Sequence, residues 1–204
     1  MTNSDELTSQ WFDYVCQLCV DRFLPYNSFS VLDFGGGNGF HYGAFNSRID
    51  NMIFDWHLVE KEESLEKAKS YKYYSKINCY SDTSEVTDNI DIIYSDSVIQ
   101  YIKNYKLLLK NFAKHEPYYI FLHRVTIGDH DNILASQTNA EFNYGAGEDK
   151  EFWFINENKI LRYMKSLGYH LYYKKYFYNH PAYKTAEDLN GSPDVNSFIF
   201  RLSQ

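Results

Sequence analysis

A glycine-rich turn behind an aspartate is the part of this sequence whose residue types and spacing are best suited to chemistry. Asp33 ends a short apolar run, and Phe34 leads into Gly35, Gly37 and Gly39 at alternate positions. This spacing predicts a turn too tight for side chains, where a ligand approaches the main chain closely. A carboxylate there is unsuited to face a pyrophosphate, so the pattern favours a ligand with a cationic amino-acid tail.

A second acidic residue supports an adenosine-type ligand. Glu60 ends the mostly apolar run 56–60, and lies 21 residues beyond Gly39. A carboxylate after the strand next to the glycine turn can accept both hydroxyls of a ribose. The alternative is an acid that only ends a strand and starts the solvated helix expected over 61–70. Dinucleotide-binding turns have the spacing G-x-G-x-x-G, whereas this one is G-x-G-x-G behind an acid.

The order of the expected elements is alternating strand and helix. Strands are expected near 29–33, 54–59, 76–80, 90–94 and 118–125, after a leading helix over 5–24. Helices are expected over about 98–114 and 156–167, and two late strands, 169–178 and 197–202, have no helix between them. The first five strands predict a parallel sheet with right-handed crossovers, and the last two an antiparallel ending. The predicted fold class is therefore α/β, with helices on both faces of a mostly parallel, seven-stranded sheet.

The acid-first glycine turn and this element order resemble the class I S-adenosylmethionine-dependent methyltransferases. The resemblance implies a Rossmann-like fold, in which the glycine turn passes under the methionine part of the cofactor and Asp33 helps to hold its amino group. It also implies that Ser95, after the fourth strand, borders the methyl group and the acceptor. Asp82 is placed like the acid that often meets the adenine amino group, although 82–85 also has the pattern of a helix cap.

A narrower resemblance covers roughly residues 29–178. The runs Leu-Asp-Phe-Gly-Gly-Gly, Ser-Asp-Ser-Val-Ile-Gln-Tyr-Ile and Phe-Trp-Phe-Ile-Asn are similar to those of a set of uncharacterised bacterial methyltransferases, some of them encoded with surface-polysaccharide genes. Arg124, Gln137 and Tyr144 resemble its later polar positions. The chain departs from the set at His123 and over 127–135, so the resemblance does not fix the substrate.

Three residues are candidates for the transfer step. His123 and Arg124 end the fifth strand, and His130 lies between two aspartates in the next connection. A hydroxyl acceptor needs a base to take its proton, and strand ends are where sheets of this type build their sites. His123 also fits a satisfied core histidine and His130 a solvated loop residue or one ligand of a divalent ion. The base is therefore not identified, and no metal site is assigned.

Composition favours one compact enzyme domain over residues 1–204. Residues 1–28 are expected to form a helical cap and 126–152 a long loop on the acceptor side. The net charge of −7 disfavours nucleic acid as a partner, and the sequence contains no apolar run long enough to span a membrane. Cys16 and Cys19 lie on the leading helix and are expected to pack into the protein core. These features predict a cytoplasmic protein, and the oligomeric state is left open.

Two other functions remain open from the sequence. One is a nicotinamide-dependent oxidoreductase, which the glycine spacing and the antiparallel ending disfavour. The other is a non-catalytic protein that keeps the fold as a binding or regulatory module, because no catalytic base stands out. The favoured function is transfer of a methyl group from S-adenosylmethionine to a small-molecule or glycan-linked acceptor, at oxygen.

Overall fold

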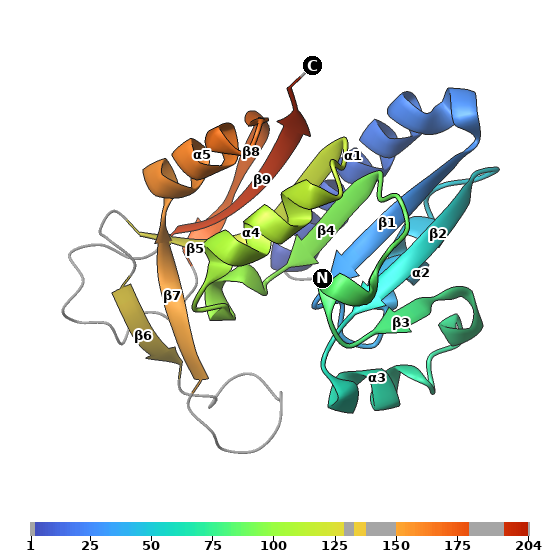
Figure 1. Cartoon of the computed structure of the whole chain (residues 1–204), viewed down its shortest axis with the longest axis horizontal. Coiled ribbons are helices and arrows are strands. Elements are labelled where there is room, and N and C mark those ends of the chain that lie inside the picture. Colours follow the sequence, from blue (N-terminus) through green and yellow to red (C-terminus); the bar gives the residue numbers. More distant parts are fainter. Residues whose placement is uncertain (1–2, 129–132, 138–149, 180–193, 204) are drawn as a thin grey trace. The chain divides into compact units, whose positions relative to one another are not determined.

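The computed structural model describes residues 3–128, 133–137, 150–179 and 194–203 (Figure 1). The chain forms two compact units. The first unit consists of the residues up to Ser95 together with His115–Ile120, and the second of Asp96–Lys114 and the residues from Phe121 onward. The chain therefore enters the second unit after Ser95. It returns to the first unit at His115 and enters the second unit again after Ile120.

The first unit is built on a parallel sheet with the strand order β3-β2-β1-β4. Its strands are β1 (Ser28–Phe34), β2 (Ile53–Val59), β3 (Asn78–Tyr80) and β4 (Ile92–Asp96), the last residue of which belongs to the second unit. Its helices are α1 (Asn3–Phe23), α2 (Phe40–Asn46) and α3 (Glu62–Ala68), with the short 3-10 helices η1 (Leu24–Tyr26), η2 (Tyr74–Lys76) and η3 (Thr83–Glu85). The sheet is parallel, so the carboxyl ends of these strands meet at one edge.

Aromatic side chains fill the core between α1 and this sheet. Trp11, Phe12 and Cys19 of α1 are buried at helical spacing, as the sequence predicts. Phe12 stacks on Tyr94 of β4, with ring centroids 5.7 Å apart. At the other end of the helix Phe23 stacks on a phenylalanine of β1 at 5.4 Å. The leading helix is therefore an integral part of the first unit.

The second unit combines parallel and antiparallel strand pairs. It contains η4 (Ile99–Tyr101), α4 (Tyr105–Lys114), most of β5 (Tyr119–Gly128), β6 (Ile133–Gln137), β7 (Lys150–Asn156), α5 (Glu157–Ser166), β8 (Tyr169–Asn179) and β9 (Asp194–Leu202). β7 runs parallel to β5 and antiparallel to β6, whereas β8 and β9 form an antiparallel pair, and β9 also pairs with β5. Asn156 caps α5 by accepting a hydrogen bond from the backbone N–H of Lys159, as expected.

The structure corrects two details of the predicted elements. The expected helix over 98–114 is interrupted: residues 99–101 form η4, and α4 begins only at Tyr105. Ser97 just before this turn has a left-handed backbone (φ 57°), which a continuous helix does not allow. The expected loop 126–152 contains the end of β5, all of β6 and the start of β7. The strands β6 and β7 are therefore additional to the seven that the sequence predicts. The expectation of a single domain over 1–204 stays a prediction.

None of the described helices combines the length and the apolar character that crossing a bilayer requires.

The burial of the two helix cysteines predicts an order of thiol reactivity. Burial raises the pKa of Cys16 to about 12 and raises that of Cys19 well above its usual value, whereas Cys79 is only partly buried. Because the thiolate is the reacting form, we expect mildly alkaline iodoacetamide to modify Cys79 first in the native protein. Peptide mass spectrometry over time measures the order, with denatured protein as the control. Modification of Cys19 as fast as that of Cys79 would contradict the buried position of the leading helix.

Candidate functional site

The turn after β1 has the backbone that its glycines predict. Gly35, Gly37 and Gly39 all have positive φ angles, of 72°, 60° and 83°. A side chain disfavours this left-handed region, so glycine adopts it at the lowest cost. The N–H of Gly35 donates to the carbonyl of Val59 in β2, and Gly39 is the residue from which α2 starts. The turn therefore links the ends of two neighbouring parallel strands to a helix start.

Asp33 holds this turn from inside the protein. Its side chain is fully buried, with Oδ1 2.9 Å from Nδ1 of His41 and Oδ2 accepting a hydrogen bond of 3.3 Å from Nε1 of Trp56. A Cβ atom placed on Gly36 would meet this carboxylate. Sequence reasoning missed His41, Trp56 and Gly36 as its neighbours. Both carboxylate oxygens are engaged within the protein, and the expected contact of Asp33 with a ligand amine stays a prediction.

Glu60 lies against the glycine turn. Its Oε2 accepts a hydrogen bond of 3.1 Å from the N–H of Gly37, and its Oε1 accepts one of 2.8 Å from the N–H of Lys61. Register explains the meeting: β1 and β2 are aligned so that Phe34 pairs with Val59, which leaves Glu60 just beyond the same edge. The structure therefore brings together the acid and the turn that the sequence picked out separately.

Asp82 follows β3, and Ser95 is the last residue but one of β4, within the strand and not after it as the sequence predicts. Asp82 caps η3: its Oδ1 accepts a hydrogen bond of 2.8 Å from the N–H of Ser84, which lowers the pKa of Asp82. The capping interpretation is confirmed, and the adenine contact stays a prediction. Ser95 pairs with Phe34 of β1. Its buried hydroxyl forms no hydrogen bond within the described part of the chain.

In the second unit, Arg124 forms a partly buried ion pair with Asp96. Arg124 donates from Nε to Oδ1 of Asp96 at 2.7 Å and from Nη2 to Oδ2 at 2.9 Å. The Asp96 side chain is 1% exposed and that of Arg124 is 30% exposed. Arg124 also has a left-handed backbone (φ 51°), and its carbonyl accepts a hydrogen bond from Gln100. Such backbone conformations persist where surrounding contacts enforce them, frequently at functional sites.

His123 has the surroundings of a core histidine. It is fully buried, its Nδ1 lies 2.7 Å from Oγ of Ser197, and its ring meets Phe177 edge to face at 4.7 Å. Ser197 comes from β9, and so its role could not be foreseen from local sequence. A catalytic role for His123 stays a prediction. His130 and Tyr144 lie outside the described residues, and Gln137 ends β6.

Across the described residues, no group of three or more histidine, cysteine, aspartate or glutamate side chains is arranged to hold a metal ion.

Comparison with known proteins shows which solved structures have a similar fold. No protein-family model matches this sequence, and no curated protein matches it either. Among solved structures, the chain is similar to the 1,6-didemethyltoxoflavin-N1-methyltransferase of Burkholderia thailandensis, solved with 1,6-didemethyltoxoflavin and S-adenosylhomocysteine (12% identity over 96% of this chain and 78% of that one, TM-score 0.64). It is also similar to the magnesium protoporphyrin IX methyltransferase of Synechocystis with bound S-adenosylhomocysteine (12% identity, 98% and 86% covered, TM-score 0.63).

A third similar structure is an S-adenosylmethionine-dependent methyltransferase from Clostridium acetobutylicum (16% identity, 95% and 91% covered, TM-score 0.59). The fold is that of S-adenosylmethionine-dependent methyltransferases. The predicted Rossmann-like class, mostly parallel with an antiparallel ending, is confirmed. At these identities the likeness concerns the fold alone.

The contact between Asp33 and the turn predicts a difference between two neighbouring glycines. A Cβ on Gly36 would clash with the carboxylate of Asp33, whereas one on Gly37 meets nothing within 4 Å. We expect Gly36→Ala to lower the free energy of unfolding by about 3 kcal/mol, as overpacking does. The matched change Gly37→Ala costs only its left-handed backbone, about 1 kcal/mol. Urea unfolding measures both. Equal effects would show that Asp33 is free to move.

The Asp96–Arg124 pair predicts a strong dependence of stability on burial. Asp13 and Arg48 form a pair with the same Nε–Oδ1 distance of 2.7 Å, but Asp13 is 62% exposed. We expect Asp96→Asn to lower the free energy of unfolding by about 2 kcal/mol, because it weakens two charge-assisted hydrogen bonds at a buried carboxylate. We expect Asp13→Asn to cost about 1 kcal/mol or less. Urea denaturation of both variants tests this, and similar losses would contradict the buried pairing.

Proposed function

We propose that this protein transfers a methyl group from S-adenosylmethionine to a small-molecule or glycan-linked acceptor, at oxygen. The observation that carries the proposal is the hydrogen bond between Glu60 and the N–H of Gly37. It joins a ribose-binding type of carboxylate to a glycine turn at neighbouring strand ends, within a fold shared with methyltransferases. S-adenosylmethionine is proposed as the cofactor on these grounds, and cytoplasmic location stays a prediction.

The residues of the first unit suit the parts of this cofactor. The left-handed glycines leave the main chain open to close approach by the methionine part, with Phe34 and Asp33 at the entry of the turn. Glu60 is proposed to exchange its hydrogen bond with Gly37 for the two ribose hydroxyls. Asp82, beyond β3, is proposed to meet the adenine amino group. Ser95, beside Phe34 in the sheet register, is proposed to border the methyl group.

The second unit supplies the candidates for the acceptor side. When bound, the cofactor supplies a sulfonium methyl that is already activated, so positioning of the acceptor provides much of the rate. Arg124 is held by Asp96 with its side chain still 30% exposed, which suits a fixed cation that orients a polar acceptor. His123 and His130 remain the proposed bases for a hydroxyl proton.

A non-catalytic module with this fold is the alternative. The observation that favours it is the complete burial of His123 against Ser197 and Phe177, which suits packing as well as proton transfer. A screen for methyl transfer onto hydroxyl-bearing small molecules and sugar nucleotides separates the two functions. Cofactor binding without turnover of any acceptor would favour the module.

Calorimetric titration tests the cofactor assignment directly. We expect S-adenosylmethionine and S-adenosylhomocysteine to bind and NAD not to bind. Glu60→Gln should weaken binding by about tenfold, because hydrogen bonds to a charged group contribute about 1.5–3 kcal/mol. Glu63→Gln, on the exposed first turn of α3, is the control and should leave the affinity unchanged. Preference for NAD, or equal effects of the two substitutions, would overturn the assignment.

A further inference from the structure

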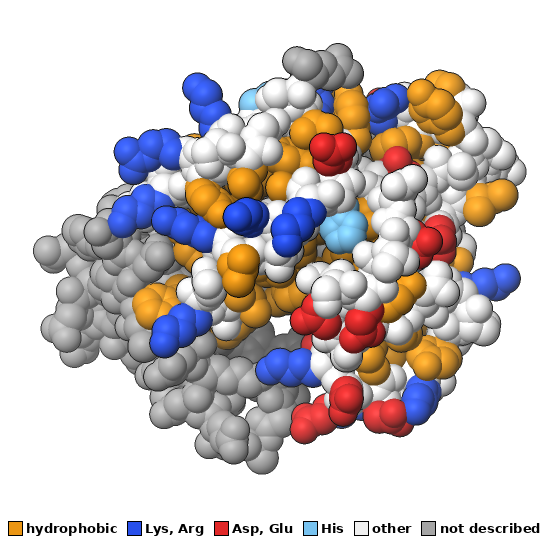
Figure 2. All heavy atoms as spheres, in the orientation of Figure 1, with side chains coloured by type: hydrophobic (Ala, Val, Ile, Leu, Met, Phe, Trp, Pro, Cys, Tyr) orange, Lys and Arg blue, Asp and Glu red, His pale blue; other side chains and the backbone are white. Residues whose placement is uncertain are grey.

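Basic side chains gather on two neighbouring helices of the second unit. We name as the α4–α5 basic surface the six residues Lys106, Lys110, Lys114, Lys159, Arg162 and Lys165 of these helices together with Lys103, which lies just before α4. α4 contains no acidic residue, and the only one in α5, Glu157, is paired with Lys174 at 2.7 Å. The whole chain carries a net charge of −7, so this concentration of cations runs against its overall balance. Figure 2 shows blue side chains grouped over these helices.

The packing of the helices directs these cations outward. Apolar residues of α4 and α5 are buried, among them Leu109, Phe112, Ile160 and Met164. Lysine and arginine at the remaining helical positions therefore face solvent, with Lys106 and Arg162 both exposed. The two helices meet where the Nζ of Lys106 lies 5.7 Å from the ring centre of Tyr163.

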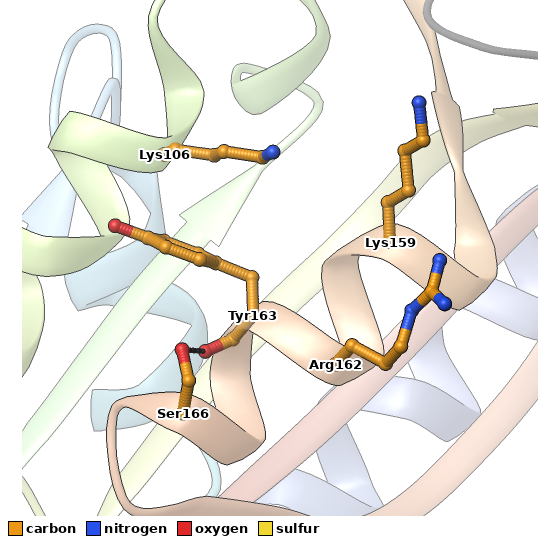
Figure 3. A pocket seen from close by; sticks show the side chains of 5 residues that line it. All are labelled: Lys106, Lys159, Arg162, Tyr163 and Ser166. Carbon is orange, nitrogen blue, oxygen red and sulfur yellow. Dashed lines mark hydrogen bonds between the residues drawn. The ribbon is translucent and has the colours of Figure 1, made fainter.

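At this meeting point the surface is hollowed. The hollow has a volume of about 380 Å³ and is lined by Lys106, Lys159, Arg162, Tyr163 and Ser166. In Figure 3 Lys106 reaches from α4 across the ring of Tyr163, while Lys159 and Arg162 project from α5. The Nε of Arg162 donates a hydrogen bond of 3.2 Å to the carbonyl of Asn158, which restrains the guanidinium. Three cationic groups from two helices thus line one small space.

Two of these cations are not neutralised by the protein. Lys106 and Arg162 form no ion pair with a carboxylate anywhere in the described ranges, and none of the side chains lining the hollow is acidic. Cations that line one hollow create a positive potential there, which attracts anions. The hollow therefore favours a compact anion with more than one negative charge.

We propose that this hollow binds a phosphate group, either of a phosphorylated small molecule or of a phospholipid headgroup. Guanidinium and ammonium groups are the usual partners of phosphate: arginine supplies directed N–H donors and lysine a mobile point charge. A tetrahedral phosphate can accept hydrogen bonds from several donors in different directions at once. A carboxylate has fewer oxygen atoms and accepts fewer such bonds. The site is open to solvent, so a phosphate on a larger molecule can enter it. The proposal is independent of the methyltransferase assignment.

Calorimetry with inorganic pyrophosphate tests the site. The double variant Lys106→Ala/Arg162→Ala removes one cation from each helix, and both side chains are exposed, so the fold should persist. The matched control is Lys67→Ala/Lys72→Ala; Lys72 also lies over a tyrosine ring, at 4.6 Å, but in the first unit. We expect the dissociation constant for pyrophosphate to rise at least about tenfold in the first variant, the loss of about one charge-assisted contact, and to stay unchanged in the control. Thermal unfolding of both variants checks that they are folded.

Two further experiments show whether the bound phosphate belongs to a soluble molecule or to a lipid headgroup, and whether the site prefers phosphate to other anions. Co-sedimentation with phosphatidylcholine vesicles, with and without phosphatidylglycerol, tests headgroups. Binding of pyrophosphate alone supports a soluble ligand, and binding of the anionic vesicles that is lost in the double variant supports a headgroup. Sulfate at matched ionic strength is the comparison for general anion attraction. Sulfate binding as tight as pyrophosphate binding, unchanged affinity in the double variant, or no binding of either phosphate source would overturn the proposal.

Discussion

The buried carboxylate of Asp33 is the constraint on which the candidate site depends. A buried charge is costly unless neighbouring groups satisfy it, and here His41 and Trp56 take one oxygen each. His41 stands at the start of α2 and Trp56 in β2, so one side chain ties the end of β1 to both. The glycine turn must pass directly over it, which leaves no room for a Cβ on Gly36. The exposed part of the turn is thereby fixed by contacts beneath it.

In the first unit, the parallel pairing of the strands is enough to bring the other candidate residues to one edge of the sheet. Parallel register places Glu60 beyond Val59 and beside the turn, and Ser95 beside Phe34. In the second unit a different principle operates: the bidentate pair of Asp96 and Arg124 holds a left-handed backbone at Arg124, which lies within β5 and not at its end as the sequence predicts. The candidate residues of the first unit thus follow from sheet geometry, and the arrangement of Arg124 in the second unit follows from a specific pair of charges.

What the sequence could predict follows the range of the interactions involved. The glycine turn, the position of Glu60, the parallel pairing of the early strands and the cap at Asn156 depend on local spacing or on the general rules of parallel sheets, and the sequence predicts them. Contacts between distant segments are not predicted: His123 meets Ser197 from β9, and Asp33 meets Trp56, and neither pairing leaves a local pattern. The sequence does not predict the break before α4, because Ser97 adopts a left-handed backbone and serine as a residue type does not indicate that conformation. The basic hollow likewise needs two helices whose adjacency only the packing reveals.

The division of the chain has a consequence for the order in which the protein can form. The first unit includes His115–Ile120, which follow α4 of the second unit. The N–H groups of Tyr118 and Tyr119 donate to the carbonyl of Asp91, so this late segment is hydrogen-bonded at the start of β4. During synthesis the first unit therefore cannot be completed until Ile120 has left the ribosome. By then α4, which lies between these two segments, has already been made, but its own unit is not whole until β9 has also been synthesised.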